Sequence, residues 1–217
     1  MNADLQLMIQ ALPFLGQAAF VTFILSIGSI FGALVVGLVI AIFRITDIKI
    51  LRSIGRVYVS FFRGTPLLIQ LFIWYYGLTS FHIVLSPWEA AYIGLSLHYG
   101  AYISESLRAA ILSISKGQWE ASYSLGMSGK QTFRNIILPQ AWRRSIPPVF
   151  NSLIDVVKSS SLASVLTVPE LTYVGDEVSA AAGFVIFPIL METALIYWGF
   201  TTVINIIQSR LEHKLRF

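Results

Sequence analysis

Long uncharged stretches dominate the pattern of hydrophobic and polar positions along this chain. The first extends from residue 5 to residue 43 without a charged side chain. A helix needs about 20 predominantly apolar residues to cross the hydrocarbon layer of a membrane, and only a helix or a closed barrel satisfies its backbone there. The pattern therefore predicts an all-α integral membrane protein with five transmembrane helices, at residues 17–43, 66–85, 87–114, 147–168 and 184–208.

Cap and proline residues indicate where several of these helices begin or bend. Ser86 and Glu89 have the spacing of a capping box before the third span. Thr65 followed by Pro66 is typical of a cap and a first helical position. We expect the remaining prolines in a first turn of the fourth span and at a kink in the fifth; these are Pro147, Pro148 and Pro188.

The basic residues predict the orientation of the chain in the membrane. Of 15 Lys and Arg, five lie between the first two spans, six at or between the ends of the third and fourth, and three after the fifth. The remaining one, Lys158, lies inside the fourth span. Residues 1–16, 79–86 and 169–183 contain none. Because basic loops stay in the cytoplasm, we expect the N-terminus outside and the C-terminus inside.

Composition agrees with this interpretation. Hydrophobic residues make up 56% of the chain and charged residues 12%, against about 25% charged in soluble domains. The net charge of +4 follows from the basic loops, so a nucleic-acid partner is not needed to explain it.

The first basic residue is Arg44, so we expect a retained first span rather than a signal peptide. The expected parts are an extracytoplasmic segment 1–16, a membrane domain 17–210 and a cytoplasmic tail 211–217.

The predicted cytoplasmic loop 115–145 has features of two short helices. Ser115 with Gln118, and Ser128 with Gln131, both have capping-box spacing. Gly126 lies between them and is a natural helix stop, because glycine adopts the left-handed conformation freely. We expect the second helix to end before Pro139. Ordered loops of this length tend to be functional.

The same loop carries a family motif. Glu120-Ala-Ser-Tyr-Ser-Leu-Gly126, then nine residues, then Ile136-Ile-Leu-Pro139 resembles the E-A-A-x-x-x-G-x9-I-x-L-P loop of permeases in ATP-binding-cassette (ABC) importers. The resemblance implies a type I ABC importer permease fold and a loop that couples the permease to a separate ATPase subunit. The coupling residues it implies are Glu120, Ala121, Ser122, Leu125, Gly126 and Pro139. Ser122 stands where the motif has a second alanine. The alternative is an amphipathic surface hairpin without a partner.

Other strings point to one branch of that family. Arg63-Gly-Thr-Pro-Leu67 and Glu105-Ser-Leu-Arg108 resemble permeases for polar amino acids. Trp74-Tyr-Tyr-Gly77 and Val168-Pro-Glu-Leu171 are part of a combination that is most similar to bacterial L-cystine permeases. The resemblance implies an inner-membrane, multi-pass location in a bacterium. It also implies three partners: an ATPase that binds ATP and magnesium, an extracytoplasmic binding protein and a second permease, with a homodimer favoured over a paralogue.

Charged groups within the predicted spans are the candidate pathway residues. A central charge costs about 2.5–3.5 kcal/mol even on the lenient insertion scale, so these groups should face the bundle interior, pair, or line a water-filled path. Asn151, Asp155 and Lys158 share one helix face, and Ser159 and Ser160 add hydroxyls. This face could bind the ammonium and carboxylate of an amino acid, or Asp155 and Lys158 could simply pair with each other.

Three further charges have other candidate roles. We expect Glu105 and Arg108 to pair in a structural or gating role near the cytoplasmic end of the third span. Glu192 in the fifth span is compatible with a pathway role or a structural one. We expect His98 to be a hydrogen-bonded contact between helices, since it has no partner at metal-ligand spacing.

Enzyme motifs are missing from the sequence. It contains no P-loop, no nucleophile elbow and no zinc-binding helix motif, so we expect no catalysis and no cofactor in this chain. Two other classes would share its spans, an ATP-independent secondary transporter or channel and a non-transporting membrane scaffold. Neither of them needs a coupling loop.

Overall fold

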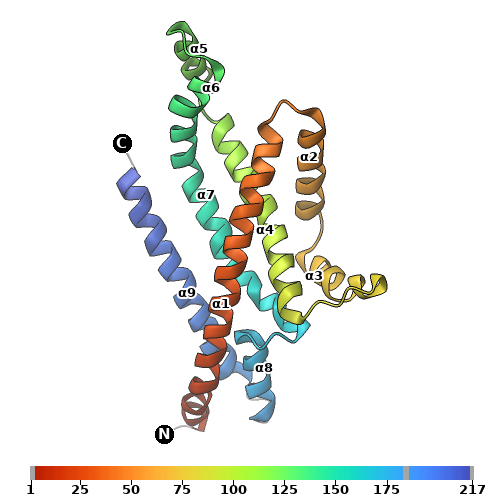
Figure 1. The fold of residues 1–217 in the computed structure, drawn as a ribbon. Coiled ribbons are helices and arrows are strands. Elements are labelled where there is room, and N and C mark those ends of the chain that lie inside the picture. The colour runs from red at the N-terminus through yellow and green to blue at the C-terminus, as the bar shows by residue number, and fades with distance from the viewer. Residues whose placement is uncertain (1–2, 183–185, 216–217) are drawn as a thin grey trace.

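The computed structural model describes residues 3–182 and 186–215, and over these ranges the chain is helical (Figure 1). The elements are α1 (Ala3–Ile45), α2 (Lys49–Gly64), α3 (Leu67–Tyr75), the 3-10 turn η1 (Gly77–Phe81), α4 (Pro87–Leu112), α5 (Lys116–Ser124), α6 (Gly129–Thr132), the π-helical turn η2 (Phe133–Ile137), α7 (Leu138–Ser159), the 3-10 turn η3 (Ser160–Leu166), α8 (Leu171–Ala181) and α9 (Ile186–Leu215).

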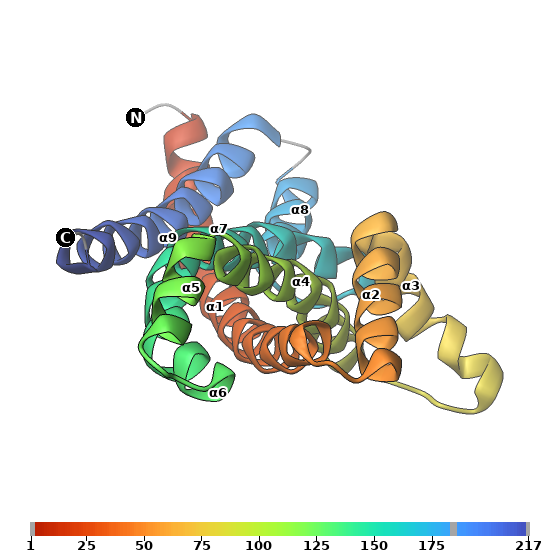
Figure 2. The same ribbon diagram turned by 90° about the horizontal axis from the view of Figure 1, so that it is seen from above.

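Two long helices, α1 and α7, pack on α4, and the bundle has an elongated shape (Figures 1 and 2). α1 packs along α4, α7 contacts α4 from another side, and α9 packs on α7 and α8. The short helices α5 and α6 project from one end of this bundle, whereas α8 and the first turns of α1 lie at the opposite end. The described parts nearest the two termini therefore lie towards opposite ends of the molecule.

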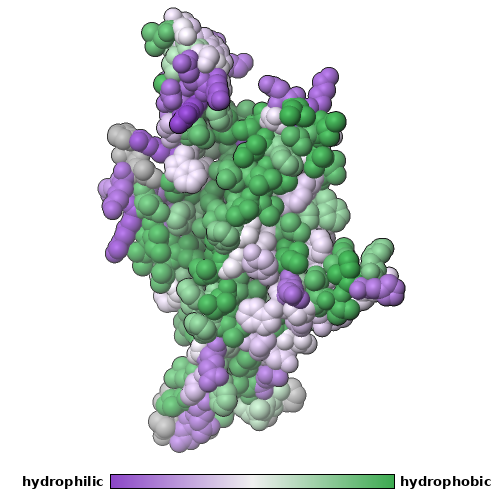
Figure 3. Space-filling view, in the orientation of Figure 1, coloured by the Kyte–Doolittle hydropathy of each residue, from purple (hydrophilic) through white to green (hydrophobic). Residues whose placement is uncertain are grey.

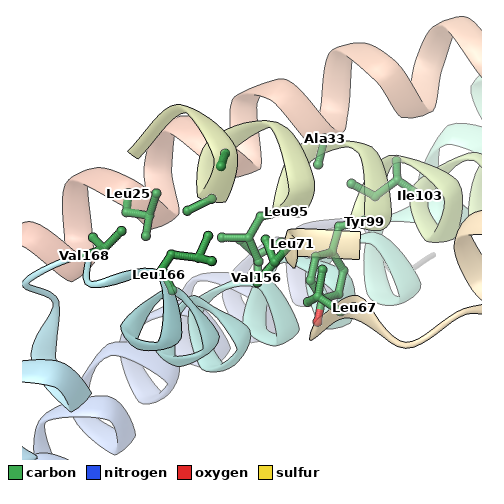
Figure 4. Close-up of a cluster of buried hydrophobic side chains, with 13 residues drawn as sticks. Leu25, Ala33, Leu67, Leu71, Leu95, Tyr99, Ile103, Val156, Leu166 and Val168 are labelled. Atoms are coloured by element: carbon green, nitrogen blue, oxygen red, sulfur yellow. The ribbon is translucent and has the colours of Figure 1, made fainter. Parts of the chain in front are cut away.

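Glycine allows α1 and α4 to approach closely. A Cβ on Gly32 would lie 2.3 Å from the Ser96 hydroxyl oxygen, and one on Gly37 would lie 2.6 Å from a methyl carbon of Ile103. Small residues at helix contacts are the usual means of packing in membranes, where apolar burial alone drives little association. The buried core continues from this contact to Leu71, Val156 and Leu166 (Figure 4).

The outer surface is apolar over most of the bundle (Figure 3). Large side chains such as Phe20, Phe31 and Trp198 are each about two-thirds exposed. Among the described residues, three helical runs are long and apolar enough to cross a membrane, at Gln6–Ile45, Gly129–Leu166 and Ile186–Lys214, and a bent pair would make a fourth. α4 has 26 residues, which is long enough to cross a membrane, but it is not among these apolar runs. The count of five spans stays a prediction.

The second predicted span, 66–85, is shorter in the structure, because α3 has only nine residues and η1 continues it to Phe81. The chain bends by 105° just before this segment, between Lys49–Gly64 and Leu67–Phe81. Pro66 has no amide hydrogen to continue the first helix, and the buried Gln70 side chain donates to Phe62 O (3.0 Å) and Thr65 O (3.1 Å) across the corner. Pro66 rather than Thr65 is the cap residue of α3.

The segment assigned to a basic loop before this bend is also a helix. It forms α2, which packs on both α1 and α4, and Tyr58 in it donates a hydrogen bond to Leu97 O at 2.5 Å. Ile50 and Val57 of α2 are exposed on its outer side. α2 therefore combines basic side chains with an apolar outer face.

Other boundaries also differ from the prediction. α1 already begins at Ala3, so the predicted extracytoplasmic segment continues the first helix. Pro147 and Pro148 lie inside α7, because its packing on α4 overrides their preference for a first turn. Pro188 lies in the first turn of α9 rather than at a kink. Residues 1–2, 183–185 and 216–217, which belong to the predicted N-terminal segment, the start of the fifth span and the tail, lie outside the described residues.

Candidate functional site

The hairpin formed by α5 and α6 has the local geometry that its sequence predicts. The Gly126 amide donates to Tyr123 O at 2.9 Å and the Met127 amide to Ser122 O at 3.1 Å. Together these bonds make a Schellman motif, which requires a left-handed residue after the helix. Gly126 supplies it with φ of +78°. α5 therefore ends where the glycine predicts.

The second helix of the hairpin begins with a complete capping box. The Ser128 amide donates to Gln131 Oε1 at 2.8 Å, and the Gln131 amide donates to Ser128 Oγ at 3.4 Å. The box predicted at Ser115 and Gln118 is not formed, because the Gln118 amide donates to the backbone oxygen of Ser115 instead, at 3.1 Å. The helix start is still at the predicted residue.

The helical path continues through Pro139, contrary to the prediction. η2 is a π-helical turn over Phe133–Ile137, and the Leu138 amide donates to Phe133 O five residues back. Pro139 then occupies the first turn of α7, where its missing amide hydrogen costs little. The wider π turn thus joins the hairpin to α7 without a break in the helical path.

The motif residues differ in exposure at the hairpin. Leu125 is 82% exposed at the tip, and Glu120, Ala121, Gly126 and Pro139 are also exposed. Ser122 is buried, and its hydroxyl donates to Gln118 O at 2.7 Å. This internal bond satisfies the hydroxyl, which explains why serine fits where the motif has alanine.

Apolar contacts hold the base of the hairpin on the end of α4. Trp119 of α5 and Phe133 of η2 pack against a buried cluster that includes Ala110 and Ile114. Arg144 of α7 donates to Ser113 O at 2.6 Å. The hairpin is therefore anchored to both α4 and α7, while its tip projects beyond the bundle (Figure 1).

Glu105 lies at the centre of an ion-pair cluster near the same end of the molecule. The predicted pair with Arg108 is present, and Glu105 also binds Arg44 of α1. Arg63 of α2 lies 4.0 Å from the same carboxylate and stacks over the Tyr102 ring, 5.2 Å from its centre. One carboxylate therefore joins α1, α2 and α4 beside a cavity of about 380 Å³.

The two additional arginines were missed from sequence. Arg44 and Arg63 are 61 and 42 residues away from Glu105 along the chain, and the hydrophobic pattern places both in the loop between the first two spans. Helical spacing reveals partners within one helix only.

The polar face of α7 places Asp155 and Lys158 together. Asp155 Oδ1 lies 2.7 Å from Lys158 Nζ, and their side chains are 51% and 57% exposed. Asn151 is also exposed. This face therefore points out of the chain's own bundle. Charges exposed on a membrane helix require water, a ligand or another protein surface beside them.

The two serines of the candidate site turn towards protein partners. The Ser159 hydroxyl is 2.6 Å from the Tyr99 hydroxyl, and Ser160 Oγ donates to Val157 O at 2.7 Å. Ser160 is buried. Ser159 thus links the polar face of α7 to α4, whereas the Ser160 hydroxyl is occupied within its own helix.

Two buried carboxylates lie towards the other end. Glu192 is 8% exposed, and its Oε2 has no hydrogen-bond partner among the described residues. Glu170 caps α8 by accepting from the Tyr173 amide at 2.8 Å and also accepts from the Tyr197 hydroxyl at 2.6 Å. Glu170 is part of the string Val168-Pro-Glu-Leu171, but the sequence analysis gives it no role of its own. An acidic residue directly before a helical segment can act as an N-cap, and that position could have identified it.

His98 is a helix contact, as predicted. Its Nδ1 lies 3.0 Å from Gln70 Oε1, between α4 and α3. Among the described residues, no group of three or more His, Cys, Asp or Glu side chains has the arrangement of a metal site.

Comparison with known proteins identifies the family. The model of the "binding-protein-dependent transport system inner membrane component" family matches residues 33–217, which include the whole hairpin. The chain belongs to this family. Relatives of this chain include permeases of amino-acid ABC transporters, so the resemblance stated from the motifs is confirmed.

Two relatives and one solved structure define the similarity. The L-cystine transport system permease protein TcyB of Bacillus subtilis (strain 168) is 42% identical over 94% of this chain and 87% of its own length. The probable amino-acid ABC transporter permease protein PatM of Vibrio harveyi is 39% identical over 99% and 97%. An amino acid ABC transporter crystallised with histidines matches with a TM-score of 0.93 and 29% identity over 99% of this chain and 100% of that chain. The type I permease fold is therefore shown.

Proposed function

We propose that this chain lines the translocation pathway of a bacterial ABC importer for L-cystine, driven by a separate ATPase subunit. The observation that carries the proposal is the exposed hairpin tip at Leu125 and Gly126, which is anchored to α4 and α7 at its base. A surface hairpin without a partner would not need a fully formed cap and a direct helical link to α7. In this proposal the ATPase binds ATP and magnesium, and this chain binds no cofactor.

The charge distribution supports a multi-pass topology in the inner membrane. The C-terminal end of α1, which carries Arg44, lies towards the same end of the molecule as the hairpin and the last described turn of α9 (Figure 1), and basic segments stay in the cytoplasm. We therefore propose a cytoplasmic C-terminus, an outer N-terminus and five crossings, with the bent α2–α3 pair as one and α4 as another. The extracytoplasmic binding protein would dock at the opposite end.

Two copies of the chain form the proposed pathway. Asp155 and Lys158 are half-exposed on a membrane helix, and a face of this kind is stable when a second subunit or a water-filled path covers it. A homodimer would place two such faces around one passage and present two hairpins to two ATPases. Asn151 and Ser159 lie on the same stretch of α7 and would line that passage.

The substrate proposal rests on similarity and on chemistry. The relative that transports L-cystine is 42% identical, and the structure with histidines is 29% identical. An amino acid carries an ammonium and a carboxylate, and Asp155 and Lys158 offer the complementary charges. The ion pair between Asp155 and Lys158 would then break when the substrate binds.

The mechanism is a population shift between two states. Closure of the ATPase dimer on ATP would favour an outward-open permease, and hydrolysis would restore the inward-open one. A ligand shifts such an equilibrium only by its differential affinity for the two states. The ATPase would favour one state through its contact with the hairpin, and η2 would connect the hairpin to α7. The Glu105 cluster would hold α1, α2 and α4 together during this change.

Competition for uptake tests the substrate. The chain would be reconstituted in proteoliposomes with its ATPase and binding protein, and labelled L-cystine uptake measured with unlabelled competitors. We expect cystine to suppress uptake more than histidine, glutamine or arginine does. Stronger suppression by another amino acid would support the importer proposal but identify that amino acid, rather than cystine, as the substrate.

The alternative function is ATP-independent secondary transport. It predicts uptake without the ATPase and gives no role to the exposed hairpin tip. Membership of a binding-protein-dependent family argues against it, as it does against a non-transporting scaffold.

A further inference from the structure

A second cavity lies between the hairpin base and the ends of α1, α2 and α4. Its volume is about 500 Å³. Three arginines line it, one from each of those helices: Arg44, Arg52 and Arg108. The family motif includes none of these arginines, and Arg44 and Arg108 also belong to the Glu105 cluster.

Positive charge exceeds negative charge around this cavity. Arg44 and Arg108 share the single carboxylate of Glu105. Arg52 donates to Thr46 O at 2.7 Å and 3.0 Å, and its Asp47 partner, 3.3 Å away, is fully exposed. An exposed pair of this kind neutralises little. A guanidinium group is also the side chain best suited to hold a phosphate.

The remaining walls are apolar. Leu112 and Ile45 line the cavity and are exposed on the outer surface, and Trp119 and Phe133 line it from the hairpin. In Figure 3 hydrophilic atoms mark the tip where α1 ends and α2 begins, and the surface just below this tip is largely apolar. A ligand that fits has an anionic head and an apolar tail, which is the chemistry of an anionic phospholipid. Basic pockets between membrane helices on the cytoplasmic side are known to bind such head groups.

We propose that this cavity binds the head group of an anionic phospholipid and that the bound lipid braces the hairpin base against α1 and α2. The proposal rests on the topology given above, which puts this end in the cytoplasm. Trp119 and Phe133 belong to the hairpin, whereas the arginines belong to the membrane helices. A lipid phosphate between them would stiffen the connection through which ATP-driven motion passes.

Native mass spectrometry of the detergent-purified chain tests binding without requiring transport. Phosphatidylglycerol would be titrated against phosphatidylcholine with the same acyl chains. We expect Arg52→Gln to weaken phosphatidylglycerol binding roughly fivefold, the effect of one basic residue at an anionic lipid surface. Arg52→Lys keeps the positive charge and should keep most of the binding. This variant distinguishes the effect of the charge on lipid binding from the effect of the two hydrogen bonds to Thr46 O.

Arg56→Gln is the matched control, because Arg56 is exposed one turn further along α2 and does not line the cavity. It should change binding by less than about twofold. Equal losses in Arg52→Gln and Arg56→Gln, or equal binding of the two lipids, would overturn the proposal. Displacement of the lipid by excess inorganic phosphate would assign the cavity to a free anion instead. These outcomes are independent of whether the chain transports cystine.

Discussion

Gly126 is the residue on which the proposed coupling depends most directly. Its φ of +78° is left-handed, and a Cβ added there would meet no atom within 4 Å. A side chain at this position would therefore cause backbone strain without a steric clash. The strain for a β-branched residue is about 1–2 kcal/mol.

Gly126→Val should uncouple transport without preventing insertion. A penalty of about 1–2 kcal/mol lowers the ratio of native to non-native turn roughly 5–30-fold, and we expect ATP-driven uptake to decrease by up to that factor. Gly126→Asn is the control, since asparagine tolerates the left-handed region. Normal uptake by the valine variant at equal expression would contradict the coupling role.

Lys158 distinguishes substrate contact from internal pairing. If it holds the substrate carboxylate, Lys158→Ala should reduce uptake while leaving assembly with the ATPase intact. The measurement is uptake kinetics together with co-purification of the ATPase. Unchanged kinetics would remove Lys158 from the pathway, and a more stable Asp155→Asn, Lys158→Met double variant would favour the pairing role.

Sequence reasoning succeeded where a residue acts on its immediate neighbours. The stop at Gly126 and the Ser128 capping box depend on a few adjacent residues, and both are present. The Glu105–Arg108 pair was predictable for the same reason. Arg44 and Arg63 join that pair only because α1 and α2 fold back onto α4, which no local spacing reveals.

At the scale of elements, the bend between α2 and α3 is the main feature that the pattern did not predict. The apolar window 66–85 begins only after the bend, and the basic residues before it gave no sign of the packed helix α2. The side chain of Gln70 ties α3 to the end of α2 and is hydrogen-bonded to His98 of α4. α1 and α9 were predicted from their long apolar runs, and α4 also begins at the predicted capping box of Ser86 and Glu89. The predicted fourth span, 147–168, differs more, because α7 covers Leu138–Ser159 and η3 follows it.

Close packing of α1 on α4 is a testable property of these elements. Gly32→Ala would place a Cβ 2.3 Å from Ser96 Oγ, and overpacking of this kind typically costs about 1–3 kcal/mol. We expect a lower melting temperature in detergent. Gly16→Ala, in the same helix with open space around it, should be neutral. A melting temperature for Gly32→Ala equal to that of Gly16→Ala would show that the contact does not limit stability.

At the scale of the whole molecule, the orientation in the membrane can be measured by cysteine labelling. The chain has no cysteine, so a single introduced thiol reports one position without background. Leu125 at the hairpin tip and Val84 in the loop before α4 are 82% and 80% exposed. An impermeant maleimide should label Val84→Cys in right-side-out vesicles and Leu125→Cys in inside-out vesicles. The reverse pattern would invert the proposed topology.

ATP dependence of uptake tests the central claim most directly. Proteoliposomes containing this chain, with or without the ATPase subunit, would be loaded with ATP or ADP and supplied with the binding protein and labelled L-cystine. The account predicts uptake only when ATP and the ATPase are both present, and its loss in Gly126→Val but not in Gly126→Asn. Uptake of cystine without the ATPase would contradict the account.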